Sequence, residues 1–261
     1  MDLHLKDKVF IVTGGAKGIG EAIVWELVKE GAIPVILGRS EEASKKLEKK
    51  IKENGGTCLN VISNLPNPEV CKKTVEEAVE KFGALHGIVN NAGVNDGVSL
   101  ESGGPGAFRE SVTTNLMHYY DLAHYALPHL RKTKGTILNI SSKTALTGQG
   151  GTSGYAASNG AQLALTREWA NELAKYGIRV NAIVPAEVMT PQYKKWIHSF
   201  GNTEARLRKI EHHIPLENRF TTSEEIASTA VFLLSDRSSH TTGQWLFVDG
   251  GYVHFDRAYE S

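Results

Sequence analysis

Thr13-Gly14-Gly15-Ala16-Lys17-Gly18-Ile19-Gly20 follows the apolar run Lys8–Thr13 and opens a segment whose apolar residues recur on one helical face. A short apolar run that ends in glycines is typical of a buried parallel strand. The glycines permit a tight turn and a close approach of the backbone to a ligand. The next helix offers free N–H groups at its N-terminus, so the stretch predicts a dinucleotide-binding loop. The residues predicted to contact the dinucleotide here are Gly14, Lys17, Gly18, Ile19 and Gly20.

Strand and helix signals alternate along the rest of the chain. Further strands are expected at Pro34–Leu37, Cys58–Ile62, Gly87–Asn90, Gly135–Ile140, Ile178–Ile183 and Trp245–Val248. Helices are expected at 18–30, 40–54, 67–82, 106–131, 153–176 and 223–235. This alternation predicts an α/β fold, a Rossmann-type doubly wound sheet of seven parallel strands. We interpret 1–261 as a single domain, with a cofactor half (about 1–130), a catalytic and substrate half (about 131–261) and a lid at about 190–220.

The charge balance of the chain argues against some functions. Lysine plus arginine and aspartate plus glutamate each total 29, so the formal net charge is zero. Electrostatic capture by nucleic acid or by an anionic membrane is therefore not expected. No run approaches the roughly 18 apolar residues of a spanning helix, and no apolar signal region precedes the first strand. The ten histidines form no i, i+4 pair, so we expect no metal site, and we expect a cytoplasmic protein.

The end of the second strand indicates which dinucleotide is bound. An acidic side chain there would accept hydrogen bonds from the adenosine ribose and favour NAD. Gly38 holds that place and Arg39 follows it, so Arg39 and Lys17 could both grip a 2′-phosphate. The pattern predicts NADP, but two solvated surface cations would look the same, and NAD stays open. Further cofactor contacts are predicted at Asn64, Leu65, Asn91, Ala92 and Gly93.

The second half of the chain carries a candidate proton-transfer pair. Tyr155 lies in Gly154-Tyr155-Ala156-Ala157-Ser158-Asn159, thirteen residues after Ser142. A phenol and a hydroxyl suit hydride chemistry, because the carbinol oxygen must lose or gain a proton in step with the hydride. A free phenol titrates at about 10, which is too high for a good base at neutral pH unless a nearby cation lowers its pKa. The alternative interpretation is an ordinary strand end followed by a helix start.

Taken together, these residues resemble the short-chain dehydrogenase/reductase family over nearly the whole chain, from Lys6 to Asp256. The motifs that carry the resemblance are the loop at 14–20, Asn90-Asn91-Ala92-Gly93, Asn115, Ser142, Tyr155, Pro185 with Thr190, and Val248-Asp249-Gly250-Gly251. Within the family the chain is most similar to the L-fucose dehydrogenase branch. That similarity rests on Ser141-Ser142-Lys143-Thr144-Ala145, Thr147-Gly148-Gln149-Gly150, Ala186-Glu187-Val188-Met189-Thr190-Pro191 and the tail Gly251-Tyr252-Val253-His254-Phe255-Asp256-Arg257.

The resemblance implies a role for each matching residue. It implies that Tyr155 is the acid/base, that Ser142 holds the substrate oxygen and that Asn115 anchors a proton-relay water. It also implies that Val188 and Thr190 fix the nicotinamide carboxamide. The reaction that it implies is oxidation of the anomeric hydroxyl of L-fucose, or of a pyranose of like configuration, to the lactone.

Asn159 departs from the family's pattern, which places a lysine four residues after the tyrosine. Positions 155 and 159 share one helical face, so the phenol lacks the positive charge that a lysine at position 159 would bring next to it. Asn159 can still hydrogen-bond a ribose hydroxyl. We therefore predict that NADP(H) binds while turnover falls, most severely near neutral pH. Lys143 is a conceivable substitute cation, and its alternative role is that of a packed or solvated loop lysine.

The loops that follow the strands supply the predicted substrate contacts. These are Asn95, Asp96, Gln149, Thr152, Glu187, Tyr193 and Trp196. Their polarity favours a polyol or aldose over a lipophilic ketone, although solvated loops would also be polar. Two other functions stay open, a non-catalytic dinucleotide-binding homologue and a reductase of a lipophilic ketone.

The resemblance also implies a homotetramer whose helices at 106–131 and 153–176 pair between subunits. The expected anchors of that interface are Tyr119, Tyr120, Tyr125, Trp169 and Leu173. The tail from Tyr252 onward is expected to reach a neighbouring subunit.

Overall fold

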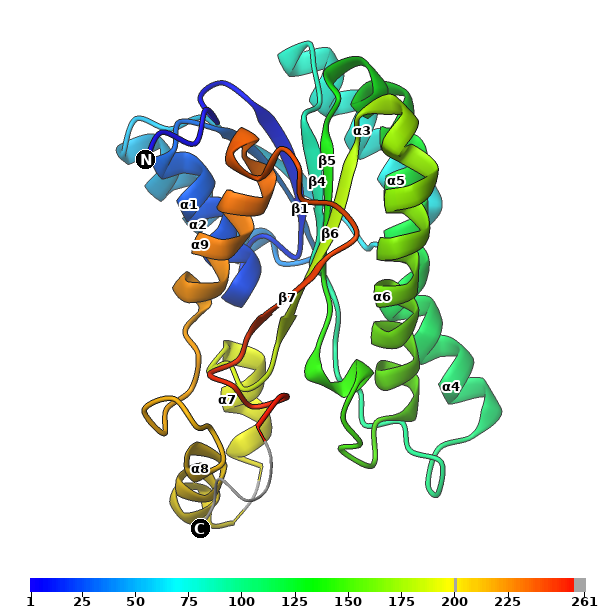
Figure 1. Cartoon of the computed structure of the whole chain (residues 1–261), viewed down its shortest axis with the longest axis vertical. Coiled ribbons are helices and arrows are strands. Elements are labelled where there is room, and N and C mark those ends of the chain that lie inside the picture. The colour runs from blue at the N-terminus through cyan, green and yellow to red at the C-terminus, as the bar shows by residue number, and fades with distance from the viewer. Residues whose placement is uncertain (200, 256–261) are drawn as a thin grey trace.

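The structure, a computed structural model, describes residues 1–199 and 201–255 (Figure 1). Within these residues one sheet of seven strands has the order β3-β2-β1-β4-β5-β6-β7, and all neighbouring strands are parallel. The strands are β1 (Val9–Thr13), β2 (Ile33–Gly38), β3 (Leu59–Ile62), β4 (Gly87–Asn90), β5 (Thr136–Ile140), β6 (Arg179–Pro185) and β7 (Trp245–Val248). The predicted doubly wound sheet is confirmed.

Helices connect the strands and form a layer on each face of the sheet (Figure 1). They are α1 (Gly18–Lys29), α2 (Glu41–Glu53), α3 (Pro68–Phe82), α4 (Pro105–Val112), α5 (His118–Thr133), α6 (Ser153–Leu173), α7 (Pro191–Ile197), α8 (Thr203–His212) and α9 (Ser223–Leu234). Short 3-10 turns lie at Lys143–Ala145, Ala174–Tyr176 and Asp236–Ser238. The segment at 190–220 contains α7 and α8, which extend beyond the carboxyl ends of the strands (Figure 1).

Two apolar cores, one on each face, hold these layers to the sheet. On one face α1 and α9 bury Ile23, Leu27 and Ile226 against the strands. On the other face α3 and α5 contribute Val75 and Leu122 to a second core, to which α6 also adds side chains. Removing each such side chain from water contributes about 1.5–3 kcal/mol to folding. Because both faces are covered, the central strands are mostly apolar, and their apolar runs are why they could be recognised in the sequence.

The helix expected at 106–131 is interrupted in the structure. A π-helical turn, Thr113–Met117, separates α4 from α5 and contains Asn115. The wider turn accompanies a contact from outside the helix, since the Asn115 side-chain oxygen accepts a hydrogen bond from the Val94 backbone N–H at 2.7 Å. π-turns of this kind often lie at functional sites. Hydrophobic periodicity alone cannot indicate such a turn.

Most of the expected interface anchors are buried inside the chain. Tyr119 is 1% exposed and its hydroxyl donates to the Ile140 carbonyl at 2.9 Å. Trp169 and Leu173 pack in the core beneath α6. These three side chains are therefore core residues, which corrects their assignment as contacts between subunits. Tyr120, at 52% exposed, remains on the surface. The homotetramer stays a prediction, and Asp256 and Arg257 of the tail lie outside the described residues.

Both cysteines are free and buried, as expected for reduced thiols. Burial raises the pKa of Cys71 to about 12, so its thiol stays protonated at neutral pH. Across residues 1–199 and 201–255, each helix is too short or too polar to cross a bilayer.

Two helical glycines provide a matched test of the packing at the first turn. A Cβ on Gly20 would lie 2.6 Å from the Asn91 amide nitrogen and would also contact the Gly14 carbonyl, whereas a Cβ on Gly160 would meet nothing within 4 Å. We expect Gly20→Ala to lower the free energy of unfolding by about 1–3 kcal/mol. We expect Gly160→Ala to raise it by up to about 1 kcal/mol through helix propensity. Urea denaturation measures both, and changes of the same sign would contradict this account.

Candidate active site

A cavity of about 1600 Å³ opens at the carboxyl ends of the strands. β1 pairs with β2 on one side and with β4 on the other, so the strand order reverses direction here and leaves a crevice. The loops after β1, β2, β4, β5 and β6 line the cavity, together with α7 and α8. The volume is large enough for a dinucleotide and a small substrate together.

The glycine loop is tied closely to the loop after β4. The Thr13 hydroxyl accepts hydrogen bonds from the backbone N–H groups of Asn91 and Ala92, at 2.9 and 3.0 Å, and the Asn91 amide donates to the Thr13 carbonyl at 2.8 Å. Gly14 has a φ of +65°, and a Cβ there would lie 3.2 Å from the Ala92 Cα. A side chain would fill this cradle, so the glycine keeps backbone N–H groups accessible to a pyrophosphate.

The structure brings most of the predicted cofactor residues to the cavity wall. Those that line it are Gly14, Lys17, Gly18, Ile19, Arg39, Leu65, Asn91, Ala92, Gly93, Val188 and Thr190. Gly20 is buried behind the wall, where it lets α1 pack against Gly14. Asn64 is exposed and is not part of the lining. Among the described lining residues Glu187 is the only carboxylate, so Arg39 and Lys17 face no acidic neighbour on the wall.

Tyr155 and Ser142 meet where α6 begins beside the end of β5. Ser142 is the residue after Ser141 at that strand end, and its hydroxyl caps a 3-10 turn by accepting from the Thr144 N–H at 3.3 Å. Burial raises the pKa of Tyr155 above its ordinary value of 10, and hydrogen bonds with Ser142 and Asn159 lower the pKa in part. The phenol is therefore protonated at neutral pH in the protein without ligands.

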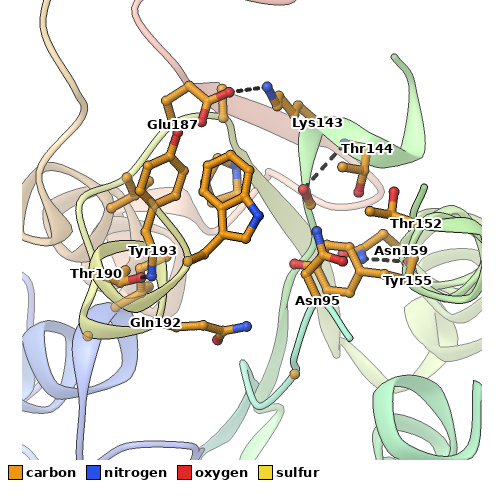
Figure 2. Close-up of a pocket in the computed structure, with 18 of the residues that line it drawn as sticks. Asn95, Lys143, Thr144, Thr152, Tyr155, Asn159, Glu187, Thr190, Gln192 and Tyr193 are labelled. Carbon is orange, nitrogen blue, oxygen red and sulfur yellow. Dashed lines mark hydrogen bonds and ion pairs between the residues drawn. The ribbon is translucent and has the colours of Figure 1, made fainter. Parts of the chain in front are cut away.

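Asn159 lies on the cavity wall but faces its own helix. Its amide donates to the Tyr155 carbonyl at 2.8 Å, and its backbone carbonyl accepts from the Ser141 hydroxyl at 3.1 Å (Figure 2). The residue is 2% exposed. It orients the first turns of α6 and brings no positive charge to the phenol.

Gln162 is a lining residue that the sequence did not single out. It lies on the same face of α6 as Tyr155 and Asn159, and its amide donates to the Asn115 backbone carbonyl at 2.9 Å. Asn115 is the residue that the family resemblance assigned to a relay water. The Gln162 side-chain oxygen is buried without a hydrogen-bond partner. The position could have been noticed because Gln162 continues the polar face of Tyr155 and Asn159 at helical spacing.

A buried chain of polar groups fixes α6 to the sheet beneath the site. The Asn90 amide donates to the Asn139 side-chain oxygen at 3.0 Å, and the Asn139 amide donates to the Thr166 hydroxyl at 2.9 Å. Thr166 in turn donates to the Gln162 carbonyl at 2.8 Å. Because all of these groups are buried, each bond holds α6, and with it Tyr155, at a defined position over β4 and β5.

The substrate end of the cavity is polar. Of the predicted substrate residues, Asn95, Gln149, Thr152, Glu187, Tyr193 and Trp196 line it. Asp96 does not line it, because its carboxylate turns back to accept from the Val98 N–H at 3.4 Å and its side chain is exposed. Other lining residues that sequence reasoning missed are Gln192, Arg206, Lys209, His213 and Tyr252.

Lys143 is neither beside the phenol nor solvated. It is buried in an ion pair with Glu187, and its ammonium lies 4.1 Å from the centre of the Tyr252 ring (Figure 2). The two carboxylate oxygens of Asp249 hold that part of the chain by accepting from the N–H groups of Gly251 and Val253, both at 2.9 Å. Lys143 thus lines the substrate end of the cavity, and the Glu187 carboxylate neutralises its charge.

Comparisons with known proteins match the whole fold. A family model described as enoyl-(acyl carrier protein) reductase matches residues 14–253. L-fucose dehydrogenase of Bos taurus is 36% identical over 252 residues, which are 96% of this chain and 91% of that protein. The crystal structure of Cj0485 dehydrogenase matches with a TM-score of 0.93 at 50% identity, over 99% of this chain and 98% of that one. L-sorbose reductase of Gluconobacter frateurii, in complex with NADPH and L-sorbose, matches with a TM-score of 0.93 at 28% identity, over 98% and 100%.

The buried polar chain can be tested by removing its middle member. We expect Asn139→Ala to lower the free energy of unfolding by about 2–4 kcal/mol, because the Asn90 amide and the Thr166 hydroxyl each lose a buried partner. Asn54→Ala is the matched control, since Asn54 is exposed at the end of α2 and its amide donates to the Lys50 carbonyl of the same helix. We expect a change within about 0.5 kcal/mol there. Equal effects of the two substitutions in urea denaturation would argue against the anchoring role.

Proposed function

Because the chain belongs to the short-chain dehydrogenase/reductase family, we propose that it is an NADP-dependent dehydrogenase that oxidises L-fucose, or a pyranose of like configuration, at the anomeric carbon. Membership of the family by itself makes the chain an NAD(P)-dependent oxidoreductase. The observation that carries the proposal is the contact of Tyr155 with Ser142 on the wall of a cavity whose substrate end is polar.

The proposed reaction balances with the groups of this site. Bound NADP would supply the hydride acceptor, nicotinamide C4, for the C–H bond of the anomeric carbon that breaks. The anomeric hydroxyl gives its proton to the Tyr155 phenolate, and its C–O bond becomes the carbonyl of a lactone. The sugar loses two electrons, NADP gains them, and one proton is released to water. Ser142 holds the reacting oxygen, which fixes its distance to the phenol.

The residues present fit the dinucleotide. The Gly14 cradle would be filled by a Cβ, and Gly18, with a φ of +59°, faces Thr190. The backbone of this loop would hold the pyrophosphate. Arg39 and Lys17 would hold a 2′-phosphate, with NAD as the other outcome of a cofactor test. One relative in the structural comparison is described with NADPH, which supports the proposal of NADP.

A sugar fits the substrate end better than an acyl chain or lipophilic ketone. Gln149 and Thr152 offer acceptors and donors that sugar hydroxyls would satisfy, and Glu187 has acceptor positions beyond those that its pair with Lys143 uses. L-fucose dehydrogenase is among the relatives, whereas the family model is described by an acyl substrate. The aromatic side chain of Trp196 suits the apolar face of a pyranose.

The uncharged Asn159 favours a second function, dinucleotide binding without efficient turnover. Burial keeps the pKa of Tyr155 high, and Asn159 offsets this only by hydrogen bonding. Oxidation needs the phenolate, whose fraction grows as the pH rises through that pKa. A raised pKa therefore costs rate at neutral pH and less at alkaline pH.

Absorbance at 340 nm tests the function with a panel of aldoses, lipophilic ketones, NADP and NAD. We expect oxidation of L-fucose with NADP, faster at alkaline than at neutral pH. Tyr155→Phe is expected to lower kcat by about 10²–10⁴-fold, since it removes the acid/base. The same variant should keep its affinity for NADPH, measured by fluorescence titration. Turnover of ketones with indifference to sugars would reject the aldose proposal.

Asn159→Lys tests the effect of the missing charge. A cation near the phenol lowers its pKa by about 1–3 units. The pH at which the rate of oxidation rises should therefore move by that amount toward neutral pH. The rate at pH 7 should rise about tenfold or more. Asn159→Met, which has similar length without charge, is the control and should show no such shift. Profiles of Asn159→Lys and the natural protein that coincide would contradict the assigned effect.

A further inference from the structure

The ion pair between Lys143 and Glu187 lines the same cavity as Ser142 and Tyr155. Each of the two side chains is 9% exposed, and both line the cavity (Figure 2). Lys143 directly follows Ser142, which holds the reacting oxygen, and Glu187 directly precedes Val188 on the cofactor side. Because Ser142, Lys143, Glu187 and Val188 all line one cavity, a substrate held by Ser142 shares that cavity with the ion pair.

The pair has hydrogen-bonding capacity left for a ligand. An ammonium has three donors and a carboxylate about four acceptor positions, and their mutual contact uses only part of these. The Tyr252 ring covers one side of the Lys143 ammonium, 4.1 Å from the ring centre, and both residues line the cavity. Burial and the Glu187 carboxylate raise the pKa of Tyr193, so its hydroxyl stays protonated beside that carboxylate.

A third polar group points to a ligand independently of the ion pair. Thr144 lines the same cavity, is 8% exposed, and its hydroxyl is buried without a hydrogen-bond partner. If the ion pair served only to join the two loops, the unpaired Thr144 hydroxyl would have no role beside it. A buried ion pair is also a poor structural tie, because desolvation offsets much of the attraction and apolar side chains would hold the loops as well.

We propose that Lys143 and Glu187 recognise two hydroxyls on neighbouring carbons of the substrate, the first on the carbon beside the oxidised one. Lys143 donates to one of these oxygens, and Glu187 accepts from the other hydroxyl. The inference rests on the proposed function and names its substrate class, a sugar with an intact vicinal diol beside the reacting carbon. Ligands without these hydroxyls are rejected because they bury the pair without replacing its partners.

The test compares L-fucose with 2-deoxy-L-fucose, which lacks the hydroxyl beside the anomeric carbon. In the natural protein the ratio of the two kcat/KM values should be about 100 or more in favour of L-fucose. In Lys143→Met and in Glu187→Gln the ratio should fall below about 10, through loss of activity on L-fucose with little change on the deoxy sugar. Lys194→Met, an exposed lysine on α7, is the matched control and should keep the natural ratio.

The outcomes separate this inference from the proposed function. Oxidation of both sugars with an unchanged ratio in the variants would overturn the inference and leave the dehydrogenase proposal standing. NADPH fluorescence titration reports whether each variant keeps its fold. If a single variant loses NADPH binding, Lys143→Met/Glu187→Leu replaces it, because removing both charges leaves neither one unpaired. If the natural protein oxidises no sugar, the proposed function fails, and equal quenching of tryptophan fluorescence by both sugars would then overturn the inference as well.

Discussion

The pairing of β1 with strands on both of its sides is the constraint on which the rest of the molecule depends. Its hydrogen bonds to β2 and β4 leave a crevice at its carboxyl end, and Thr13 at that end ties the loop after β4 to the glycine loop. The α6 helix is fixed over the same end through Asn139 and Thr166. Tyr155 is therefore held by the sheet itself and needs no mobile loop for its placement.

Much of this could be predicted from the sequence, because buried parallel strands and glycine loops depend on neighbouring residues. The seven strands and the capping of α2 by Ser40 follow from such local patterns. The π-turn at Asn115 and the burial of Tyr119 did not follow, since each depends on contacts from distant segments. Asn64 and Asp96 were expected at the cavity because they follow strands, but loop direction takes them elsewhere.

The electrostatics of the site show the same division between local and distant causes. The sequence already shows that the phenol has an uncharged neighbour in Asn159. In the structure the Asn159 amide donates to the Tyr155 backbone carbonyl. Lys143 was an ambiguous cation in the sequence because its partner, Glu187, comes 44 residues later. Because Lys143 is paired with Glu187 at the substrate end of the cavity, its charge does not replace the lysine that is missing beside Tyr155. A single ion pair thus decides between the two interpretations of Lys143 that the sequence left open.

The aromatic contact of Tyr252 with Lys143 has a practical consequence for handling the protein. The Asp249 carboxylate accepts hydrogen bonds within the turn that carries Tyr252, so the Tyr252 ring is a fixed part of the cavity wall. A label or tag placed on this turn would therefore disturb the substrate end of the cavity. Met1, which is 93% exposed at the opposite side of the sheet (Figure 1), is the safer point of attachment for tags, fusion partners or surface immobilisation.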